Sequence, residues 1–196
     1  MLDPVIDVPP VSSGTLIYLV GPSGSGKDSL IEAAEPCLVR LGVRRARRVI
    51  TRSAEAQGEQ ATGVSRETFD QYVRQGAFAL HWQANGLAYG IPACIDTWLM
   101  QGHSVLVNGS RAHQPDALQR YPDMVTVQLQ VSQDVLRRRL EARGRESGEE
   151  IEQRLARSAA LEPLKAGAVH LLDNSGCLQD TVDALVVLLK DLGITH

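Results

Sequence analysis

Short apolar runs alternate along the chain with longer segments whose hydrophobic residues repeat every three or four positions. The runs that predict strands are Thr15 to Val20, Val49 to Thr51, Ser104 to Val107, Val125 to Val131 and Val169 to Leu172. Strands separated by helices favour parallel pairing, with helices packed on both faces of the sheet. The pattern therefore predicts an α/β fold of three layers with a mainly parallel sheet.

The helical segments begin and end at residues that favour helix caps. A helix is predicted from Lys27 to Leu41, ending near Gly42; another follows Ser65 and ends near Gly76; a third follows Ser132 and spans Asp134 to Ala142; and Ser147 with Glu150 matches a capping box. In the last helix, Leu178, Val182, Leu185, Val186 and Leu189 share one face, and Gly193 lies just beyond them. We expect this face to lie in the core.

Length and composition favour one domain and a small partner. The chain has 196 residues, of which 43% are hydrophobic, which is enough for one core and short for two. Residues 1–13, with several Pro and Ser, predict a flexible extension before a single domain at 14–196. A net charge of −3 gives no general attraction to nucleic acid. The sequence leaves the oligomeric state open and allows a homodimer.

The sequence also predicts where the protein works. No apolar run approaches the roughly 20 residues that span a bilayer, and the N-terminus does not have the pattern of a signal peptide. We therefore expect a cytoplasmic protein without a membrane partner. The cysteines, Cys37, Cys94 and Cys177, are far apart and form no CxxC pair, so buried free thiols are expected.

The strongest motif is a glycine-rich loop between the first strand and the first helix. Glycines let backbone N–H groups curl around phosphate, the helix N-terminus adds positive potential, and Lys27 brings a cation to the β- and γ-phosphates. The residues expected to bind ATP are Gly21, Pro22, Ser23, Gly24, Ser25, Gly26, Lys27, Asp28 and Ser29.

Asp28 departs from the usual motif, in which Ser or Thr follows the lysine and contacts Mg²⁺. A carboxylate is a hard oxygen ligand for Mg²⁺, although it also brings negative charge close to the triphosphate. Alternatively, Asp28 stabilises the first helical turn through the helix dipole. We favour the metal-linked role, with Mg²⁺ arriving together with ATP.

Arginines follow the fourth predicted strand in a spacing that suits phosphoryl transfer, a reaction that asks a protein mainly to position reactants and to stabilise charge. Arg139 and Arg143 share one helical face, and Arg154 lies beyond a polar turn. This arrangement predicts a mobile lid. The alternative is an ordinary solvated basic surface, to which we assign Arg137, Arg138 and Arg157.

These motifs resemble the guanylate-kinase-like family. The matching segments are Leu136 to Gly144 (LxxRLxxRG), Arg154 to Arg157 (RLAR), Ile50 to Arg52, Val64 to Phe69, Gly86 to Pro92 and Leu172 to Asn174. The resemblance covers nearly the whole chain after residue 13 and implies a P-loop NTPase core. It also implies an acceptor subdomain at about 52–92 and a lid at about 139–154. By resemblance, the catalytic residues are Lys27, Arg139, Arg143 and Arg154.

The acceptor side departs from guanylate kinase. Arg52 remains, but the second arginine that grips a GMP phosphate is absent, Ser53 to Gly63 is short and polar, and Asn108 stands where an Asp is expected. The segments GPSGSGKD, ITR, WxANGLxYG and VLVNGSRAH instead resemble family members that act on a sugar phosphate in phosphonate catabolism. The resemblance implies that ATP phosphorylates ribose 1,5-bisphosphate at its 1-phosphate, giving 5-phosphoribosyl 1-diphosphate and ADP. A nucleoside monophosphate kinase and a noncatalytic interaction module are the alternatives.

Such an acceptor carries two phosphates and no base, so its pocket calls for cations and hydroxyl-binding side chains. The residues expected to bind it are Arg52, Tyr89, Asn108, Ser110, Arg111 and His113. Each has an ordinary structural alternative, such as a turn former or a half-buried sheet residue. Trp82 and Trp98 are expected to fill structural contacts outside the site.

Overall fold

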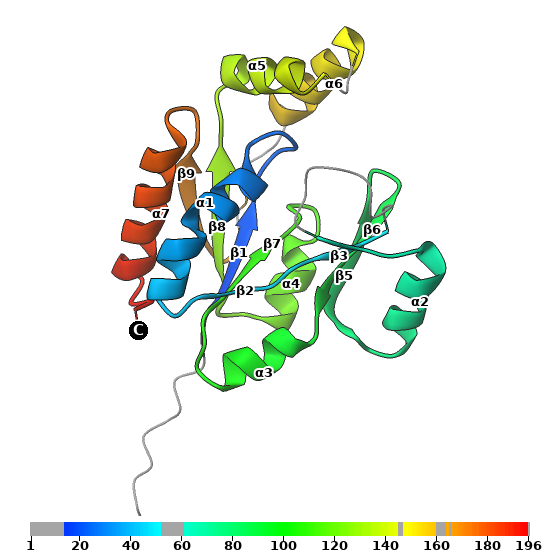
Figure 1. Cartoon of the computed structure of the whole chain (residues 1–196), viewed down its shortest axis with the longest axis vertical. Coiled ribbons are helices and arrows are strands. Elements are labelled where there is room, and N and C mark those ends of the chain that lie inside the picture. The colour runs from blue at the N-terminus through cyan, green and yellow to red at the C-terminus, as the bar shows by residue number, and fades with distance from the viewer. Residues whose placement is uncertain (1–13, 52–60, 145–146, 160–163, 165, 196) are drawn as a thin grey trace, which may run out of the picture.

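The central sheet of the protein is parallel throughout. The computed structural model describes residues 14–51, 61–144, 147–159, 164 and 166–195. Five strands lie in the order β2 (Arg44–Arg45), β7 (Val105–Asn108), β1 (Leu16–Val20), β8 (Val125–Gln130) and β9 (Ala168–Asp173), and each neighbouring pair is parallel (Figure 1). All five strands predicted from the apolar runs are present, four in this sheet and one in a second sheet.

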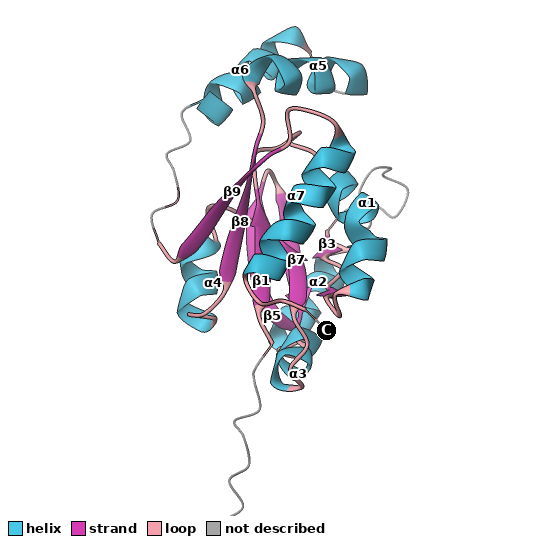
Figure 2. Cartoon of the chain, turned by 90° about the vertical axis from the view of Figure 1, so that its left-hand side faces the viewer, coloured by secondary structure: helices cyan, strands magenta, loops and turns pink. Residues whose placement is uncertain are grey.

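Helices cover both faces of this sheet, which makes three layers (Figure 2). One face carries α1 (Lys27–Arg40) and α7 (Leu178–Asp191), and the other carries α3 (Cys94–Met100) and α4 (Gln114–Arg120). Strand β1 serves both layers because its side chains alternate: Ile17 and Leu19 pack with α1 and α7, whereas Leu16 and Tyr18 face α3 and α4. The expected three-layer fold is confirmed.

A second, smaller sheet lies beside the first. Its strands lie in the order β4 (Thr62–Gly63), β3 (Val49–Ile50), β6 (Leu87–Pro92) and β5 (Phe78–Ala84). Helix α2 (Arg66–Arg74) covers it through a cluster of Phe69, Val49 and Ala88. The β5–β6 hairpin turns at Asn85 and Gly86, whose φ angles of 51° and 75° match a two-residue turn of the type that favours Asn-Gly.

Two further helices, α5 (Gln133–Arg143) and α6 (Gly148–Ala159), form a unit beyond the carboxyl ends of β8 and β9 (Figure 1). This helical pair has its own small core of Leu136, Leu140, Ile151 and Leu155. The predicted caps are present: the Ser132 hydroxyl accepts from the N–H of Val135, and Ser147 and Glu150 bond each other's backbone N–H.

Some expectations need correction, and others fall outside the described residues. Cys94 and Cys177 are exposed and Cys37 is only half-buried, so the cysteines are free, as expected, but they are not buried. In the part of the chain that the structure describes, no helix has both the length and the apolar surface to cross a membrane. The predicted extension at 1–13 lies outside the described residues.

Candidate active site

The glycine-rich loop joins the carboxyl end of β1 to the N-terminus of α1, as predicted. Gly24 and Gly26 both have φ near 91°, a conformation that side chains with a Cβ rarely adopt. A Cβ on Gly26 would also lie 2.6 Å from the Asn174 amide nitrogen. The Lys27 ammonium folds back over the loop and donates to the carbonyl oxygens of Gly21 (2.8 Å) and Pro22 (3.1 Å). The cation is thus held at the mouth of the loop.

Asn174, which follows β9, fixes the floor of the loop. Its amide donates to the Ser25 carbonyl at 2.7 Å, and its own side-chain oxygen accepts from Thr181 Oγ1 at 2.9 Å. Both Ser25 and Asn174 are buried. Satisfied buried hydrogen bonds of this kind resist rearrangement, because breaking one leaves a polar group without a partner away from water. The loop is therefore held in shape before any ligand arrives.

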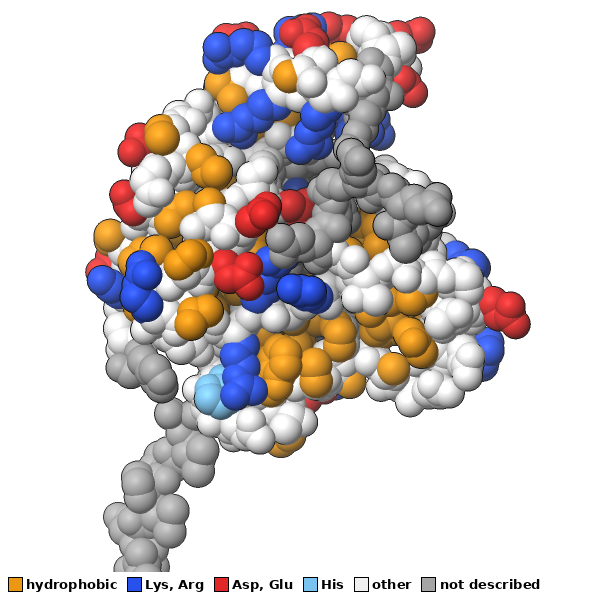
Figure 3. All heavy atoms as spheres, viewed as in Figure 1, with side chains coloured by type: hydrophobic (Ala, Val, Ile, Leu, Met, Phe, Trp, Pro, Cys, Tyr) orange, Lys and Arg blue, Asp and Glu red, His pale blue; other side chains and the backbone are white. Residues whose placement is uncertain are grey.

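Two of the arginines predicted to lie in a lid reach this loop from α5 and α6. Arg139 donates to the carbonyl oxygens of Ser25 (3.2 Å) and Asn174 (2.8 Å), and Arg154 donates to the Ser23 hydroxyl at 2.9 Å. The core of this helical pair also packs on the loop, because a Cβ added to Gly24 would lie 2.9 Å from Leu136. Figure 3 shows Lys and Arg side chains along the edge of this helical unit that faces the rest of the molecule.

Arg143 lies at the last turn of α5, exposed and one helical turn beyond Arg139. It makes no hydrogen bond or ion pair with the described residues. Burial lowers the pKa of Arg139, and the neighbouring charges of Arg143 and Arg138 lower it further. Like charges brought together in this way favour an anion between them.

Asp28 and Asn108 meet next to the loop. The Asn108 amide, at the carboxyl end of β7, donates to Asp28 Oδ1 at 2.8 Å. Arg48 approaches the same carboxylate oxygen at 3.6 Å and donates to the Asn108 backbone carbonyl at 3.4 Å. The Arg48 side chain is only 9% exposed, whereas that of Asp28 is 38% exposed. The carboxylate thus lies at the surface of the site and is balanced by a buried cation.

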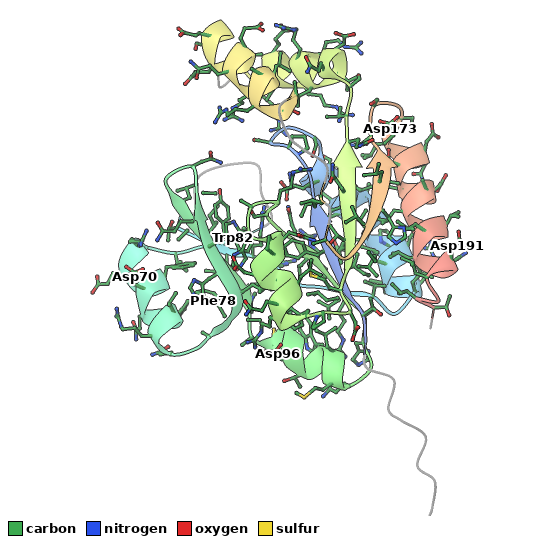
Figure 4. The ribbon with its side chains drawn as sticks, turned by 180° about the vertical axis from the view of Figure 1, so that it is seen from behind. Asp70, Phe78, Trp82, Asp96, Asp173 and Asp191 are labelled. Atoms are coloured by element: carbon green, nitrogen blue, oxygen red, sulfur yellow. The ribbon has the colours of Figure 1, made fainter. Side chains whose placement is uncertain are left out.

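Three aromatic rings stack beside this ion pair. Trp82 on β5 stacks on Tyr89 on β6, with ring centroids 5.6 Å apart, and on His113, at the start of α4, with centroids 5.5 Å apart. The Arg48 guanidinium lies over the Tyr89 ring, 5.5 Å from the ring centroid, which is within the range of a cation–π interaction. In Figure 4, Trp82 lies between the β5–β6 hairpin and α4. Trp82 thus packs directly against two of the residues predicted to bind the acceptor, and its place outside the site stays a prediction.

The other residues expected to bind the acceptor do not take part in this aromatic stack. The Tyr18 hydroxyl accepts a hydrogen bond from the backbone N–H of Ser110 (2.9 Å) and donates one to the backbone carbonyl of Ser110 (3.1 Å). Arg111 lines a pocket of ≈ 350 Å³ that also includes Pro22, Gln130 and Asp173, and burial lowers its pKa. Asp173 ends β9, and its position is labelled in Figure 4. Arg52 lies outside the described residues.

Three residues that contact the predicted site residues were not among those predictions: Arg48, Trp82 and Asn174. Two of them carried a usable signal. Asn85-Gly86 is a strong hairpin turn, and pairing outward from it places Trp82 directly opposite Tyr89. Asn174 directly follows a strand of the parallel sheet, where ligand-binding residues gather. Arg48 stands among four arginines in a run of five residues, and nothing in that run distinguishes the buried one.

The parallel sheet, the glycine-rich loop and the arginines above it together define a P-loop phosphotransferase of the guanylate-kinase-like type. No protein-family model matches the chain. A ribose 1,5-bisphosphate phosphokinase PhnN from Azotobacter vinelandii is 57% identical over 177 residues, covering 90% of this chain and 96% of that protein. The corresponding protein of Pseudomonas fluorescens is 58% identical over 181 residues, covering 90% and 95%. The chain belongs to the ribose 1,5-bisphosphate phosphokinase PhnN family.

Solved structures support the fold. A guanylate kinase from Anaplasma phagocytophilum superposes with a TM-score of 0.65 at 20% identity, covering 92% of this chain and 86% of that one. A gluconokinase from Sinorhizobium meliloti gives a TM-score of 0.52 at 21% identity, covering 92% and 94%. At these identities the likeness concerns the fold alone.

Proposed function

We propose that this protein transfers the γ-phosphoryl group of ATP to the 1-phosphate of ribose 1,5-bisphosphate, giving 5-phosphoribosyl 1-diphosphate and ADP, in phosphonate catabolism. The observation that carries the choice of acceptor is the 57% identity, over nine-tenths of the chain, to a relative named for this acceptor. In the reaction, an oxygen of the 1-phosphate forms a bond to the γ-phosphorus while the bond between that phosphorus and the β–γ bridging oxygen breaks. A phosphate oxygen attacks as an anion, so no strong base is required near neutral pH.

The donor site is the segment Gly21 to Ser29. The loop N–H groups and the N-terminus of α1 bind the phosphates, because this end of a helix favours negative charge. Lys27 now bonds two loop carbonyls, and we propose that it exchanges them for the β- and γ-phosphate oxygens when ATP binds.

The residues beside the loop suit Mg²⁺, which favours hard oxygen ligands and usually takes only one or two carboxylates besides substrate phosphates. Asp28 offers a carboxylate that is partly exposed. Asn108 Oδ1 is buried and has no hydrogen-bond partner among the described residues. When bound, Mg²⁺ would neutralise charge on the β- and γ-phosphates. We propose that Asp28 and Asn108 hold it, directly or through water.

The acceptor lies on the side of the smaller sheet. We propose that Tyr89, His113 and Ser110 line its pocket, and that Arg52 and Arg111 bind its phosphates. Asn108, which the sequence predicts to bind the acceptor, is assigned to Mg²⁺ instead because its amide bonds Asp28. The stack of Trp82 on Tyr89 and His113 supports this assignment, because rigid side chains position a substrate better than mobile ones. The acceptor subdomain at about 52–92 and the single domain at 14–196 are parts of the same proposal.

The lid at about 139–154 completes the site. We propose that Arg139, Arg143 and Arg154 stabilise the charge on the transferring phosphoryl group and exclude water that would otherwise hydrolyse ATP. Contacts of Arg139 and Arg154 with the loop support this role. A homodimer remains a prediction, which the molar mass in solution tests.

The test is a phosphoryl-transfer assay with Mg²⁺ and ATP, in which ribose 1,5-bisphosphate and GMP are compared at matched concentrations and both ADP and the phosphorylated product are measured. We expect 5-phosphoribosyl 1-diphosphate to form and kcat/KM to be at least about a hundredfold lower for GMP, since a site built for two phosphates leaves charged groups unpaired around a nucleotide that carries only one. Phosphorylation of GMP alone would show a nucleoside monophosphate kinase, and no transfer to either acceptor would contradict a kinase assignment.

A further inference from the structure

Two unusual residues of the sequence are direct partners in the structure. Asp28 replaces the Ser or Thr that usually follows the P-loop lysine, and Asn108 occupies a strand end where the family resemblance predicts Asp. The two positions are 80 residues apart in the chain, yet the Asn108 amide donates to Asp28 Oδ1 at 2.8 Å. The two departures from the usual motif therefore lie side by side in the structure.

Together the two replacements keep one carboxylate and one neutral oxygen group beside the loop. The usual pair offers a neutral oxygen from the loop and a carboxylate from the strand. This chain offers a carboxylate from the loop and a neutral amide oxygen from the strand. Each arrangement contributes one negative charge, and each presents two hard oxygen groups to a divalent cation.

The groups around Asp28 and Asn108 indicate that these two residues act together. Asn108 Oδ1 is buried and has no hydrogen-bond partner in the part of the chain that the structure describes, which is a costly state for an acceptor unless a ligand or water completes it. Arg48 contacts both positions, through Asp28 Oδ1 at 3.6 Å and through the Asn108 carbonyl at 3.4 Å. Its cation thus lies beside the Asp28 carboxylate and beside the backbone of Asn108.

We propose that Asp28 and Asn108 have exchanged the carboxylate and neutral roles of the usual Mg²⁺-binding pair, with Arg48 as the positioning residue that serves both. The proposal rests on the ATP-dependent part of the proposed function and not on the identity of the acceptor. It differs from the simpler interpretation in which Asp28 only complements the dipole of α1, because that interpretation assigns nothing to Asn108.

The experiment measures binding rather than turnover. The affinity of the protein for a non-hydrolysable ATP analogue is titrated by calorimetry with and without Mg²⁺, without any acceptor. In Asp28→Ser we expect the gain in analogue affinity from Mg²⁺ to fall by about 10- to 100-fold, the usual range for losing a group that supports a metal. In Asn108→Asp we expect weaker binding of the metal-free analogue and a lower Tm, because two carboxylates lie within hydrogen-bond distance.

The decisive variant combines both changes, Asp28→Ser with Asn108→Asp, and so restores one carboxylate and one hydroxyl at the usual positions. We expect it to recover the effect of Mg²⁺ to within about threefold of the original protein and to melt at a higher temperature than Asn108→Asp. A double variant that binds no better than the worse single variant refutes the exchange. Circular dichroism checks that each variant is folded.

A matched control removes a carboxylate from another helix. Asp180 lies in the first turn of α7, as Asp28 does in α1, so Asp180→Ser tests the helix dipole without touching the site. We expect it to leave the effect of Mg²⁺ unchanged. An equal loss in Asp180→Ser would show that the loss is not specific to Asp28 and would contradict the exchange. Because no acceptor is present, these outcomes are independent of whether ribose 1,5-bisphosphate or a nucleotide is the substrate.

Discussion

Individual side chains of the lid make contacts that can be removed one at a time. Arg154 donates to the Ser23 hydroxyl, whereas Arg157, three residues later on α6, donates to the backbone carbonyl of Gln153 in its own helix. We expect Arg154→Met to lower kcat by about a hundredfold or more, as losing an arginine that stabilises transferring phosphate does, with a smaller change in the acceptor KM. Steady-state kinetics with both substrates measure this.

Arg157→Met is the matched control, because it removes the same charge from the same helix. We expect its kcat to stay within about threefold of the original, the range of an exposed surface charge. Equal losses in the two variants would mean that the total positive charge of the lid matters and the contact with Ser23 does not.

Trp82 is a residue whose role depends on shape rather than charge. It stacks on the rings of Tyr89 and His113, so Trp82→Leu removes both stacking contacts. We expect the acceptor KM to rise by about tenfold while the affinity for ATP is unchanged, because positioning is lost on the acceptor side only. Trp82→Phe, which keeps an aromatic face, should recover most of the loss. A drop in ATP affinity would instead indicate a general structural defect.

For single residues, the sequence predicts a functional role when both the residue type and its place in a motif point to one kind of chemistry. Lys27 and the loop glycines are of this kind, since their motif leaves few alternatives. Arg48 and Trp82 are of another kind: their roles arise from what packs against them. Burial of one arginine among four close neighbours, or stacking across two elements, depends on tertiary contacts that no local pattern encodes.

Helices α5 and α6, the predicted lid, have their own core, separate from the clusters that cover the central sheet. Ile151→Ala leaves a cavity in this core, a change that costs about 2–5 kcal/mol where the surroundings cannot collapse. We expect amide hydrogen exchange to quicken in α5 and α6 while α1 and α7 keep their protection, and kcat to fall because the lid arginines lose their support. Exchange measured by mass spectrometry reports each helix separately.

Ile151→Val is the graded control and should show the same pattern at a fraction of the size. Faster exchange in α1 and α7 as well would mean that the lid and the central sheet unfold together. In that case the fall in kcat would carry no information about the lid.

Elements were predictable where local chemistry marks both of their ends. The helix after Ser132 and the capping box at Ser147 and Glu150 formed where the sequence placed them, because a cap satisfies backbone groups within a few residues. Other elements escaped prediction, among them strands β5 and β6, although these have seven and six residues. Helices α3 and α4 have seven residues each, and β2 and β4 have two each, too few to show a period. These elements form because the larger sheets offer them partners.

Over the whole molecule, Tyr18 links the central sheet to the site. Its side chain is fully buried in β1, and its hydroxyl bonds the backbone of Ser110 after β7. Burial raises the pKa of Tyr18 from 10 to about 12. Between these values the unfolded chain releases this proton and the folded chain keeps it, so the free energy of unfolding falls as pH rises. One proton corresponds to about 1.4 kcal/mol per pH unit.

Denaturant unfolding from pH 8 to pH 11 tests this coupling against Tyr18→Phe. At pH 8 we expect the variant to be less stable by about 1 kcal/mol, because the Ser110 backbone loses its hydroxyl partner. Above pH 10 its stability should fall less steeply than that of the original protein, so the two curves converge, although Tyr121, whose pKa is also raised to about 12, keeps some slope in both. Parallel curves would mean that Tyr18 has the same pKa in the folded and the unfolded protein. In that case Tyr18 would stabilise the protein through its hydrogen bond to Ser110 and would not make the stability depend on pH.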